Sequence, residues 1–397
     1  MTPASARRDV AGELRASFRL QPLLVPVCSL LLALVVAGVV IVAVGSNPVE
    51  AYWALLRGMY GSPDRIAASL GRATPFVGAA LAVAFAFKAG LFNIGAEGQV
   101  LVGATAAAWV GTWAWVADVP GPLAVVLVML AGAVAGGLYG AIPGALKART
   151  GAHEVIVTIM LNNIALFVVR WLVNSRDPLL LRDPSASSAR SGPIAGNARL
   201  PEIIGTDPPV HAGLLVALTL CVLVWLIIRR TTFGFEVTTV GTNPHAARYA
   251  GIGVGRTIVL SMMLSGALAG LAGAGEVAGT EGWLSPGVFL NVGFDAIAIA
   301  LLARANPYGI ILTAVLWGSM LSGAGLMQQE SGLSIDAVRI VQALVLLFVA
   351  ADAIVRTVFR LRDTRAAGLP ATAATATLEV EEPPVPDPDD DPAEVER

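Results

Sequence analysis

Uncharged apolar runs recur along most of this chain. Several continue for 18 residues or more without a charged side chain, and residues 23–44 and 123–146 are the clearest. A helix rises about 1.5 Å per residue, so each run can cross the hydrocarbon core of a bilayer, about 30 Å thick. A large soluble protein buries one such helix but does not repeat the pattern along its length. The pattern therefore predicts an integral membrane protein.

Charged and turn-forming residues divide the chain into separate apolar runs. These runs predict an all-α integral membrane fold of about ten transmembrane helices. The predicted spans are 23–44, 73–87, 100–116, 123–146, 155–173, 212–228, 257–275, 288–303, 308–326 and 337–355. An even number of spans places both termini on one side of the membrane.

Basic residues decide which side that is. With the N-terminus in the cytoplasm, 16 Arg and Lys residues fall on inside segments and nine on outside segments. Cytoplasmic loops carry the excess of Arg and Lys in membrane proteins, so we expect both termini to be cytoplasmic. Only 14% of the residues are charged, against about 25% in soluble proteins, which agrees with a membrane fold.

The spans divide the chain into three parts. We expect a cytoplasmic N-terminal segment (1–22), a transmembrane domain (23–355), and a basic stub followed by an acidic tail (356–397). Within the domain, 174–211 is predicted to be an external loop with little regular structure, and 229–256 a cytoplasmic loop. The tail is predicted to be disordered, because after Arg365 it carries nine acidic residues and one basic residue.

A six-residue pattern occurs twice, at 92–97 and at 290–295. Both copies read apolar, Asn, apolar, Gly, any residue, acid, and they are 198 residues apart. The first copy precedes a span that leaves the cytoplasm and the second a span that enters it, so the two halves have inverted topology. Inverted repeats with short or interrupted spans mark transport pathways, and 73–87 and 288–303 are the shortest predicted spans.

Polar residues in or near the spans are candidates for the wall of such a pathway, since they are costly in lipid unless they face water or protein. Two alternatives stay open: the acids cap helix N-termini, or the polar side chains form interhelical hydrogen bonds. The candidates are Asn93, Glu97, Gln99, Glu154, Asn162, Asn291 and Asp295. Glu276 and Glu281 either line the mouth of the pathway or are simply solvated.

Small residues predict where helices pack closely. Gly132, Gly136, Gly140 and Gly144 repeat every four residues and so share one helix face. Ser265, Ala269 and Gly273 form a second small-residue face. Such faces let helix backbones approach each other in a membrane. The partner of the glycine face is either in this chain or in a second copy.

The predicted cytoplasmic loop contains a short helix signal at 241–251. Asn243 suits the cap and Pro244 the first helical position, while Gly251 suits the end. Ala246, Ala247 and Ala250 would give the helix a small apolar face. It is either a docking element for a cytosolic motor or a plain connector at the membrane surface.

Three blocks together resemble a known family. They are 92–99 (FNIGAEGQ), 153–162 (HEVIVTIMLN), and 241–251 followed by 293–302. Over about residues 20–360 the chain resembles permease subunits of bacterial ABC importers for simple sugars and nucleosides, in the branched-chain amino acid/ribose permease-like superfamily. The blocks are most similar to the nucleoside branch. The acidic tail is not part of that family's pattern.

The resemblance implies several partners and roles. It implies a multi-pass protein of the bacterial plasma membrane, a cytosolic ATPase subunit, a second and homologous permease, and an extracytoplasmic substrate-binding lipoprotein. It also assigns the coupling helix that docks on the ATPase. The residues of that helix would be Asn243, Pro244, Ala246, Ala247, Arg248 and Tyr249.

We expect no cofactor or metal in this chain and no nucleic-acid partner. The only lysines, Lys88 and Lys147, lack the context of a phosphate-binding loop, so ATP and Mg²⁺ are expected on the ATPase partner. His153 and Glu154 begin a zinc-protease motif, but Val157 stands where its second histidine is required.

Two other functions compete with the importer. An ion-coupled secondary transporter would use Glu97, Glu154 and Asp295 as ion carriers and would need no ATPase. An intramembrane enzyme has no nucleophile–base pair to support it. Under the importer hypothesis, the resemblance favours a nucleoside over a simple sugar as the transported molecule.

Overall fold

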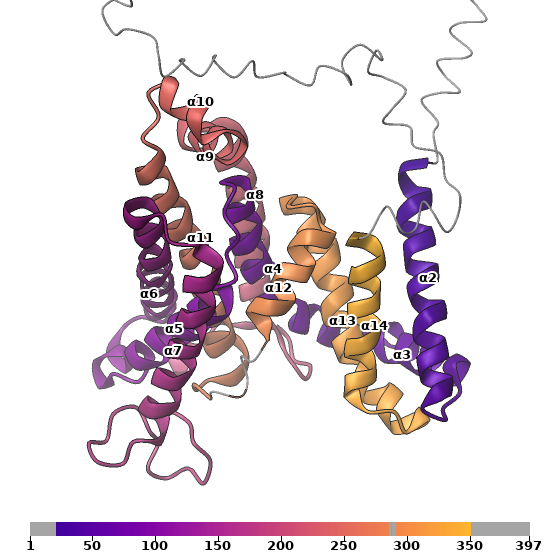
Figure 1. Ribbon diagram of the computed structural model, residues 1–397. Coiled ribbons are helices and arrows are strands. Elements are labelled where there is room, and N and C mark those ends of the chain that lie inside the picture. The colour runs from indigo at the N-terminus through magenta and orange to yellow at the C-terminus, as the bar shows by residue number, and fades with distance from the viewer. Residues whose placement is uncertain (1–20, 286, 288–290, 351–397) are drawn as a thin grey trace, which may run out of the picture. The chain divides into compact units, whose positions relative to one another are not determined.

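Within the described residues, each predicted span overlaps one α-helix of the computed structural model, which describes residues 21–285, 287 and 291–350 (Figure 1). The predicted N-terminal segment, except its last two residues, and the predicted tail lie outside the described residues. Residues 29–350 form one structural unit, which includes residues 29–43 of the first helix.

The unit is almost entirely helical. Its α-helices are α2 (Gln21–Ala43), α3 (Pro48–Tyr60), α4 (Pro63–Lys88), α5 (Ala96–Gly111), α6 (Gly121–Thr150), α7 (Glu154–Asn174), α8 (Gly213–Arg230), α9 (Thr232–Thr242), α10 (Pro244–Tyr249), α11 (Val254–Glu276), α12 (Val292–Leu302), α13 (Pro307–Ser331) and α14 (Ile335–Ala350). Shorter elements are the 3₁₀ turns η1 (Ala114–Asp118) and η2 (Gly196–Ala198), the π-turn η3 (Val277–Glu281), and the strands β1 (Glu202–Ile204) and β2 (Val210–His211).

Six described helices are long and apolar enough to cross a membrane by themselves: α4, α6, α7, α8, α11 with η3, and α13. The helices α2 and α3 make a seventh candidate if counted as one span, bent by 118° between them. The all-α membrane architecture is therefore confirmed. The count of ten and the orientation of the termini stay predictions, and the last predicted span continues beyond the described residues.

The predicted start of the second span was wrong. The helix α4 begins at Pro63, ten residues before the predicted start at residue 73, and has 26 residues. Ser62 caps it, since its Oγ accepts a hydrogen bond from the backbone N of Arg65 at 3.3 Å. Charged residues in its first turns, Asp64, Arg65 and Arg72, concealed this part of the helix from the hydropathy pattern. The prediction that 73–87 is one of two short spans is therefore also wrong.

Two amphipathic helices were not predicted. The first is α3, capped by Asn47, with Ala51, Ala54 and Leu55 buried against other helices. The second is α9, which occupies much of the predicted cytoplasmic loop. Both are shorter than a membrane crossing and carry polar residues, so a search for apolar runs passes over them.

Glycines bring α6 and α11 into close contact. A Cβ on Gly136 or Gly140 would collide with the α11 backbone, at Gly266 and Met262. The glycine face of α6 therefore packs on a helix of the same chain. The helix α5 also packs here: a Cβ on Gly273 would collide with its backbone at Val100, and a Cβ on Gly132 of α6 would lie 3.1 Å from the backbone O of Gly103. The helices α5, α6 and α11 therefore pack against one another.

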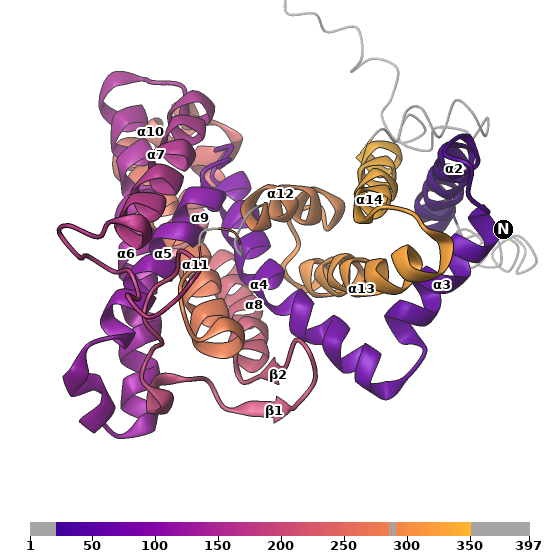
Figure 2. The ribbon, with the colours of Figure 1, turned by 90° about the horizontal axis from the view of Figure 1, so that it is seen from below.

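The helices α2, α3, α13 and α14 lie together (Figure 2) and share a hydrophobic cluster of their own. Ala33, Ala37 and Ile41 of α2 belong to it, together with Met327 of α13. Tyr52 of α3 also donates a hydrogen bond from its hydroxyl to the backbone O of Leu34, at 2.6 Å.

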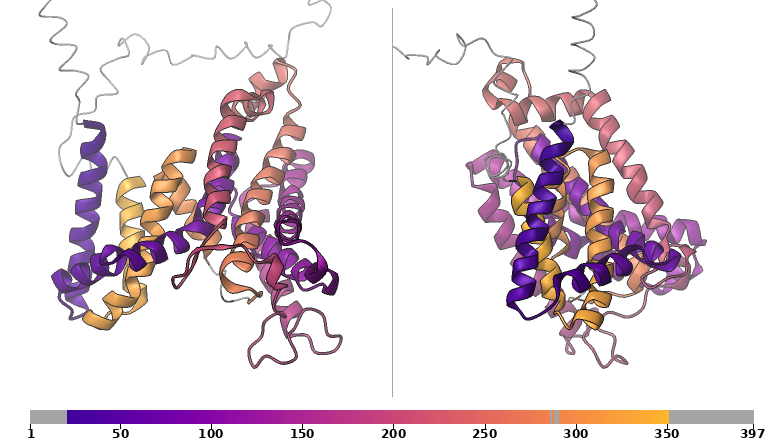
Figure 3. Two further views of the ribbon diagram at one scale, coloured as in Figure 1. Left: turned by 180° about the vertical axis from the view of Figure 1, so that it is seen from behind. Right: turned by 90° about the vertical axis from the view of Figure 1, so that its right-hand side faces the viewer.

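The two ends of the helical unit differ. The views in Figures 1 and 3 place α9 and α10 at one end and the irregular segment after α7 at the other. We call them the α10 end and the loop end. The segment 174–211 contains only η2 and the antiparallel pair β1–β2, which agrees with the predicted lack of regular structure. Its backbone is bonded to η3, which follows α11, for example from Leu200 N to Ala278 O at 2.8 Å.

Candidate functional site

The two copies of the repeated pattern meet in space. The carboxylate of Glu97 accepts hydrogen bonds from the backbone N of Asn291, at 2.7 Å to Oε1, and of Gly293, at 2.6 Å to Oε2. A Cβ on Gly293 would collide with the backbone of Glu97, so only glycine allows this approach. Glu97 therefore caps the N-terminus of α12, where the helix dipole favours a negative charge. Leu290, the first residue of the second copy, lies outside the described residues.

The two helices that begin at these copies run in opposite directions. Lys88, before α5, and Arg304, after α12, line one cavity at the α10 end. The helix α5 thus leads away from that end and α12 leads toward it, as an inverted repeat requires. With 16 and 11 residues, they are about 24 Å and 16 Å long, each less than the hydrocarbon thickness of about 30 Å. The short helices at the repeat are therefore α5 and α12.

Asn93, from the first copy, holds the start of α5 in place. Its Nδ2 donates to Gln99 Oε1 at 2.9 Å and to Ser265 Oγ at 2.8 Å, and its Oδ1 accepts from Gly95 N at 2.9 Å. Ser265 Oγ in turn donates to the backbone O of Ala82 at 2.6 Å. Asn93 is fully buried and Gln99 nearly so. The network joins α4, α5 and α11 where the chain becomes irregular.

Asn162 supports the same region from α7. Its Oδ1 accepts from Gly98 N at 2.8 Å, and its Nδ2 donates to the backbone O of Ile94 at 2.9 Å. Thr158, one turn earlier, donates to the backbone O of Glu154 at 2.7 Å. Glu154, Thr158 and Asn162 are four residues apart, so they form one buried polar stripe on α7, which faces the start of α5.

Glu154 is the remaining member of that stripe. Its Oε2 pairs with Lys147 Nζ at 2.5 Å, and its Oε1 accepts from Phe92 N at 3.4 Å. Lys147 lies in the last turn of α6 and Glu154 in the first turn of α7, positions that suit their charges. The pair joins the α6–α7 connection to the segment before α5.

Asn291 and Asp295, by contrast, line a cavity of about 290 Å³ at the loop end, here called the outer cavity. Four carboxylates and two guanidinium groups contribute to its wall, together with apolar side chains such as Phe76. This mixture offers hydrogen-bond donors, acceptors and an aromatic ring to a small polar molecule. The lining residues are Gly71, Arg72, Pro75, Phe76, Asp207, Pro208, Glu276, Thr280, Glu281, Asn291, Val292, Asp295, Leu321 and Arg339.

The structure places Glu276 and Glu281, whose position the sequence left open, in this wall. Three further residues of the wall were not predicted from the sequence: Arg72, Asp207 and Arg339. Arg339 carried a usable signal, because it is a charged residue within a predicted apolar span. Arg72 borders such a span. Asp207 lies in a loop, and its sequence context gave no signal that it belongs to a site.

His211 packs against η3, and Thr280 of η3 lines the outer cavity. The His211 ring is buried, accepts a hydrogen bond at Nδ1 from Gly213 N at 3.1 Å, and lies 3.4 Å from Thr280 Oγ1 at Nε2. A Cβ on Gly279 would collide with this ring, so the ring and η3 are closely packed. Burial lowers the pKa of His211 to about 4, which leaves the ring neutral at pH 7.

A second cavity, of about 580 Å³, lies at the α10 end and is here called the inner cavity. Ala303 and Arg304, which follow α12, line it, whereas Asn291 and Val292 at the start of α12 line the outer cavity. The two cavities therefore lie at opposite ends of one short helix.

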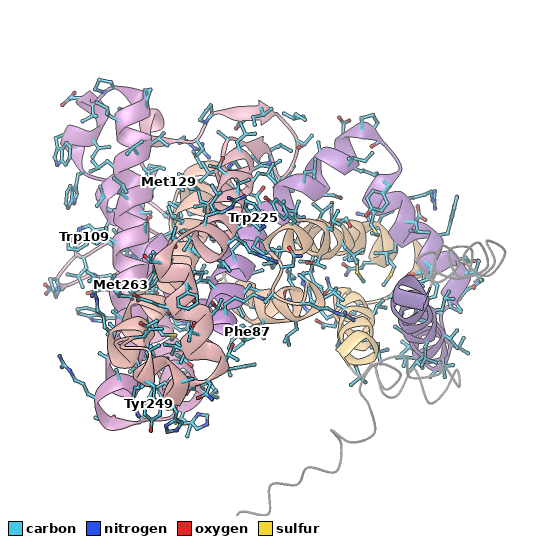
Figure 4. The ribbon with its side chains drawn as sticks, turned by 90° about the horizontal axis from the view of Figure 1, so that it is seen from above. Phe87, Trp109, Met129, Trp225, Tyr249 and Met263 are labelled. Carbon is cyan, nitrogen blue, oxygen red and sulfur yellow. The ribbon has the colours of Figure 1, made fainter. Side chains whose placement is uncertain are left out.

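At the α10 end the predicted coupling helix is α10. Asn243 Oδ1 accepts hydrogen bonds from the backbone N of His245 and Ala246, at 3.0 and 3.1 Å, and Pro244 is the first helical residue. Ala247 is buried, whereas Tyr249, labelled in Figure 4, is 93% exposed. One face of α10 is thus held by the protein and the rest is open to a partner.

Comparisons with known proteins give a consistent result. A family model described as "Branched-chain amino acid transport system / permease component" matches residues 65–350. The guanosine ABC transporter permease protein of Bacillus subtilis is 43% identical over 343 residues, which are 85% of this chain and 96% of that protein. The nucleoside ABC transporter permease protein of Lactococcus lactis is 35% identical over 342 residues, 84% of this chain and 92% of that protein. The glucose ABC transporter permease protein of Haloferax volcanii is 36% identical over 332 residues, 81% and 86% of the two chains.

Proposed function

Because this chain belongs to the family of branched-chain amino acid transport system permease components, we propose that it carries a nucleoside across the membrane. The chain is the permease subunit of an ABC importer and a multi-pass protein of the plasma membrane. It is not an enzyme, since ATP hydrolysis in such systems takes place on a separate ATPase subunit.

Two relatives support the nucleoside cargo. The Bacillus and Lactococcus proteins, named for guanosine and for nucleosides, align over at least 84% of this chain. The glucose permease of Haloferax is similar at 36% identity and keeps a simple sugar as the alternative cargo. Both cargo classes are neutral and rich in hydroxyl groups, but only a nucleoside adds an aromatic base.

The outer cavity supports the same proposal. Its volume of about 290 Å³ is near the lower limit of small-molecule sites, about 300 Å³. Carboxylates such as Asp295 and Glu281 can accept hydrogen bonds from hydroxyl and N–H groups, while Arg72 and Arg339 can donate them. Phe76 provides a ring for a planar base.

We propose a pathway that runs beside α12, from the outer to the inner cavity. Asn291 and Asp295 border its outer part. Hydrogen bonds and an ion pair fix the irregular segment at the start of α5 and so maintain its shape. The residues that form them are Asn93, Glu97, Gln99, Glu154 and Asn162. A helix of 11 residues is a suitable barrier because a small displacement opens it.

Family membership implies an ATPase subunit and a substrate-binding protein as partners. More finely, we propose a homologous second permease, an extracytoplasmic binding lipoprotein, and docking of the ATPase on α10. No cofactor is placed in this chain, and ATP and Mg²⁺ are placed on the ATPase subunit.

Uptake by the assembled transporter in proteoliposomes tests the cargo. With the ATPase and binding protein present, we expect ATP-dependent uptake of labelled nucleosides and none of glucose or pentoses. Ionophores that collapse proton and sodium gradients should leave uptake unchanged. Uptake of sugars alone would overturn the nucleoside cargo, and uptake driven by a proton gradient without ATP would overturn the ATP-driven mechanism.

A further inference from the structure

The inner cavity collects positive charge from three separate elements. Lys88 ends α4, Arg229 lies in the last turn of α8, and Arg304 follows α12. No acidic residue lines this cavity within the part of the chain that the structure describes. The lining residues are Lys88, Trp225, Ile228, Arg229, Thr238, Ala303, Arg304, Ala305, Asn306, Pro307 and Tyr308.

These three positive charges are not paired with acidic side chains in the part of the chain that the structure describes. Among the described residues, none of the three has a carboxylate within 4.0 Å, whereas Lys147 and Arg57 at other places are paired with Glu154 and Glu330. The C-terminal dipoles of α4 and α8 offset part of the repulsion for Lys88 and Arg229. Arg304 lies two residues beyond Leu302, the last residue of α12, so the C-terminal dipole of that helix acts on it in the same way.

The backbone at Arg304 is strained. Arg304 and Ala305 have φ angles of +52° and +51°, in the left-handed region that non-glycine residues rarely occupy. Such a conformation is unfavourable for a residue with a Cβ and typically persists where function requires a fixed turn. The turn places Arg304 in the same cavity as Lys88 and Arg229.

Aromatic residues indicate the depth of this cavity in the bilayer. The rings of Trp225 and Tyr308 lie 6.0 Å apart between centroids, and both line the cavity (Figure 4 labels Trp225). Trp and Tyr are enriched at the level of the lipid headgroups. The two rings therefore agree with a position of the cavity near the membrane surface, on the side of α9 and α10.

We propose that the inner cavity binds a phosphate group, supplied by an acidic phospholipid headgroup or by a phosphorylated solute, through Lys88, Arg229 and Arg304. A phosphate neutralises converging cations and accepts several charge-assisted hydrogen bonds from them. Thr238 and the hydroxyl of Tyr308 provide further donors in the wall. The site does not depend on which cargo is carried.

Binding to the full-length protein within the assembled transporter tests this site. We would prepare it in nanodiscs of phosphatidylcholine alone or with phosphatidylglycerol, and count retained lipids by native mass spectrometry. In phosphatidylcholine nanodiscs, inorganic phosphate and a nucleoside monophosphate would be titrated in a thermal-shift assay. Arg229→Gln is the test variant and Arg230→Gln the matched control, because Arg230 is the next residue of α8 but does not line the cavity.

We expect wild type and Arg230→Gln to retain phosphatidylglycerol or to respond to a soluble phosphate. Arg229→Gln should weaken that binding about tenfold, the loss expected for one charge-assisted hydrogen bond. Lys88→Gln provides a second variant if the first does not fold. Retention of phosphatidylglycerol identifies the lipid as the source, and a response in phosphatidylcholine alone identifies the solute. Absence of both, or equal losses in Arg229→Gln and Arg230→Gln, would overturn the proposal.

Discussion

A single carboxylate connects the two halves of this protein. Glu97, in the first copy of the repeat, accepts hydrogen bonds from the backbone of Asn291 and Gly293, in the second. The sequence identified the acid and left open whether it faced a pathway or capped a helix. The sequence did not predict that Glu97 caps the helix that starts at the second copy. That contact joins residues almost 200 positions apart, and no local pattern indicates it. The cap is observed, and Glu97 thereby fixes the start of α12.

Loss of this carboxylate should destabilise the protein. Glu97→Ala leaves the buried N–H of Gly293 without its acceptor, at a cost of about 1–3 kcal/mol, and also removes the acceptor of the more exposed Asn291 N–H. Glu97→Gln keeps one oxygen acceptor and should have an intermediate effect. Thermal unfolding of the purified protein measures both, with Glu202→Ala on the exposed strand β1 as control. If Glu97→Ala unfolds at the same temperature as Glu202→Ala, the cap does not stabilise α12.

At the scale of elements, the sequence predicted apolar helices well and amphipathic ones poorly. In the part of the chain that the structure describes, all ten predicted spans overlap α-helices, but α3, α9 and the first ten residues of α4 escaped prediction. Their polar residues face solvent or the outer cavity, as Arg72 does, so hydropathy alone cannot detect them. The start of α10 was detected because Asn243 and Pro244 form a local cap signal that does not depend on tertiary contacts.

Charge reversal on α10 tests its proposed docking role. Arg248 is exposed on this helix, so Arg248→Glu should abolish ATP-dependent uptake and weaken co-purification of the ATPase subunit. Membrane insertion should stay normal, because the fold holds α10 through Ala247, not Arg248. Arg256→Glu, an exposed change outside α10, is the matched control. Normal uptake by Arg248→Glu would show that α10 is not the docking element.

At the scale of the whole molecule, the resemblance read from three short blocks is confirmed by the family match over residues 65–350. The cavities could not be predicted in the same way. Each draws its wall from at least four elements, and the outer one combines residues as distant as Arg72 and Arg339. A single sequence contains no information on which of these side chains converge. The inverted repeat nevertheless pointed to α12, which both cavities border.

The proposed pathway requires that the two ends of α12 face opposite sides of the membrane. In a variant with Cys28 and Cys221 replaced by alanine, Asp295→Cys lies in the outer cavity and Ala305→Cys in the inner one. A membrane-impermeant maleimide should label Asp295→Cys only from outside and Ala305→Cys only from the cytoplasm. Ala300→Cys, fully buried within α12, should resist labelling from either side and serves as the control. A transported nucleoside should slow labelling of Asp295→Cys, because it would occupy the same cavity. Reaction of both ends from one side would contradict the pathway, since α12 could not then separate the two cavities.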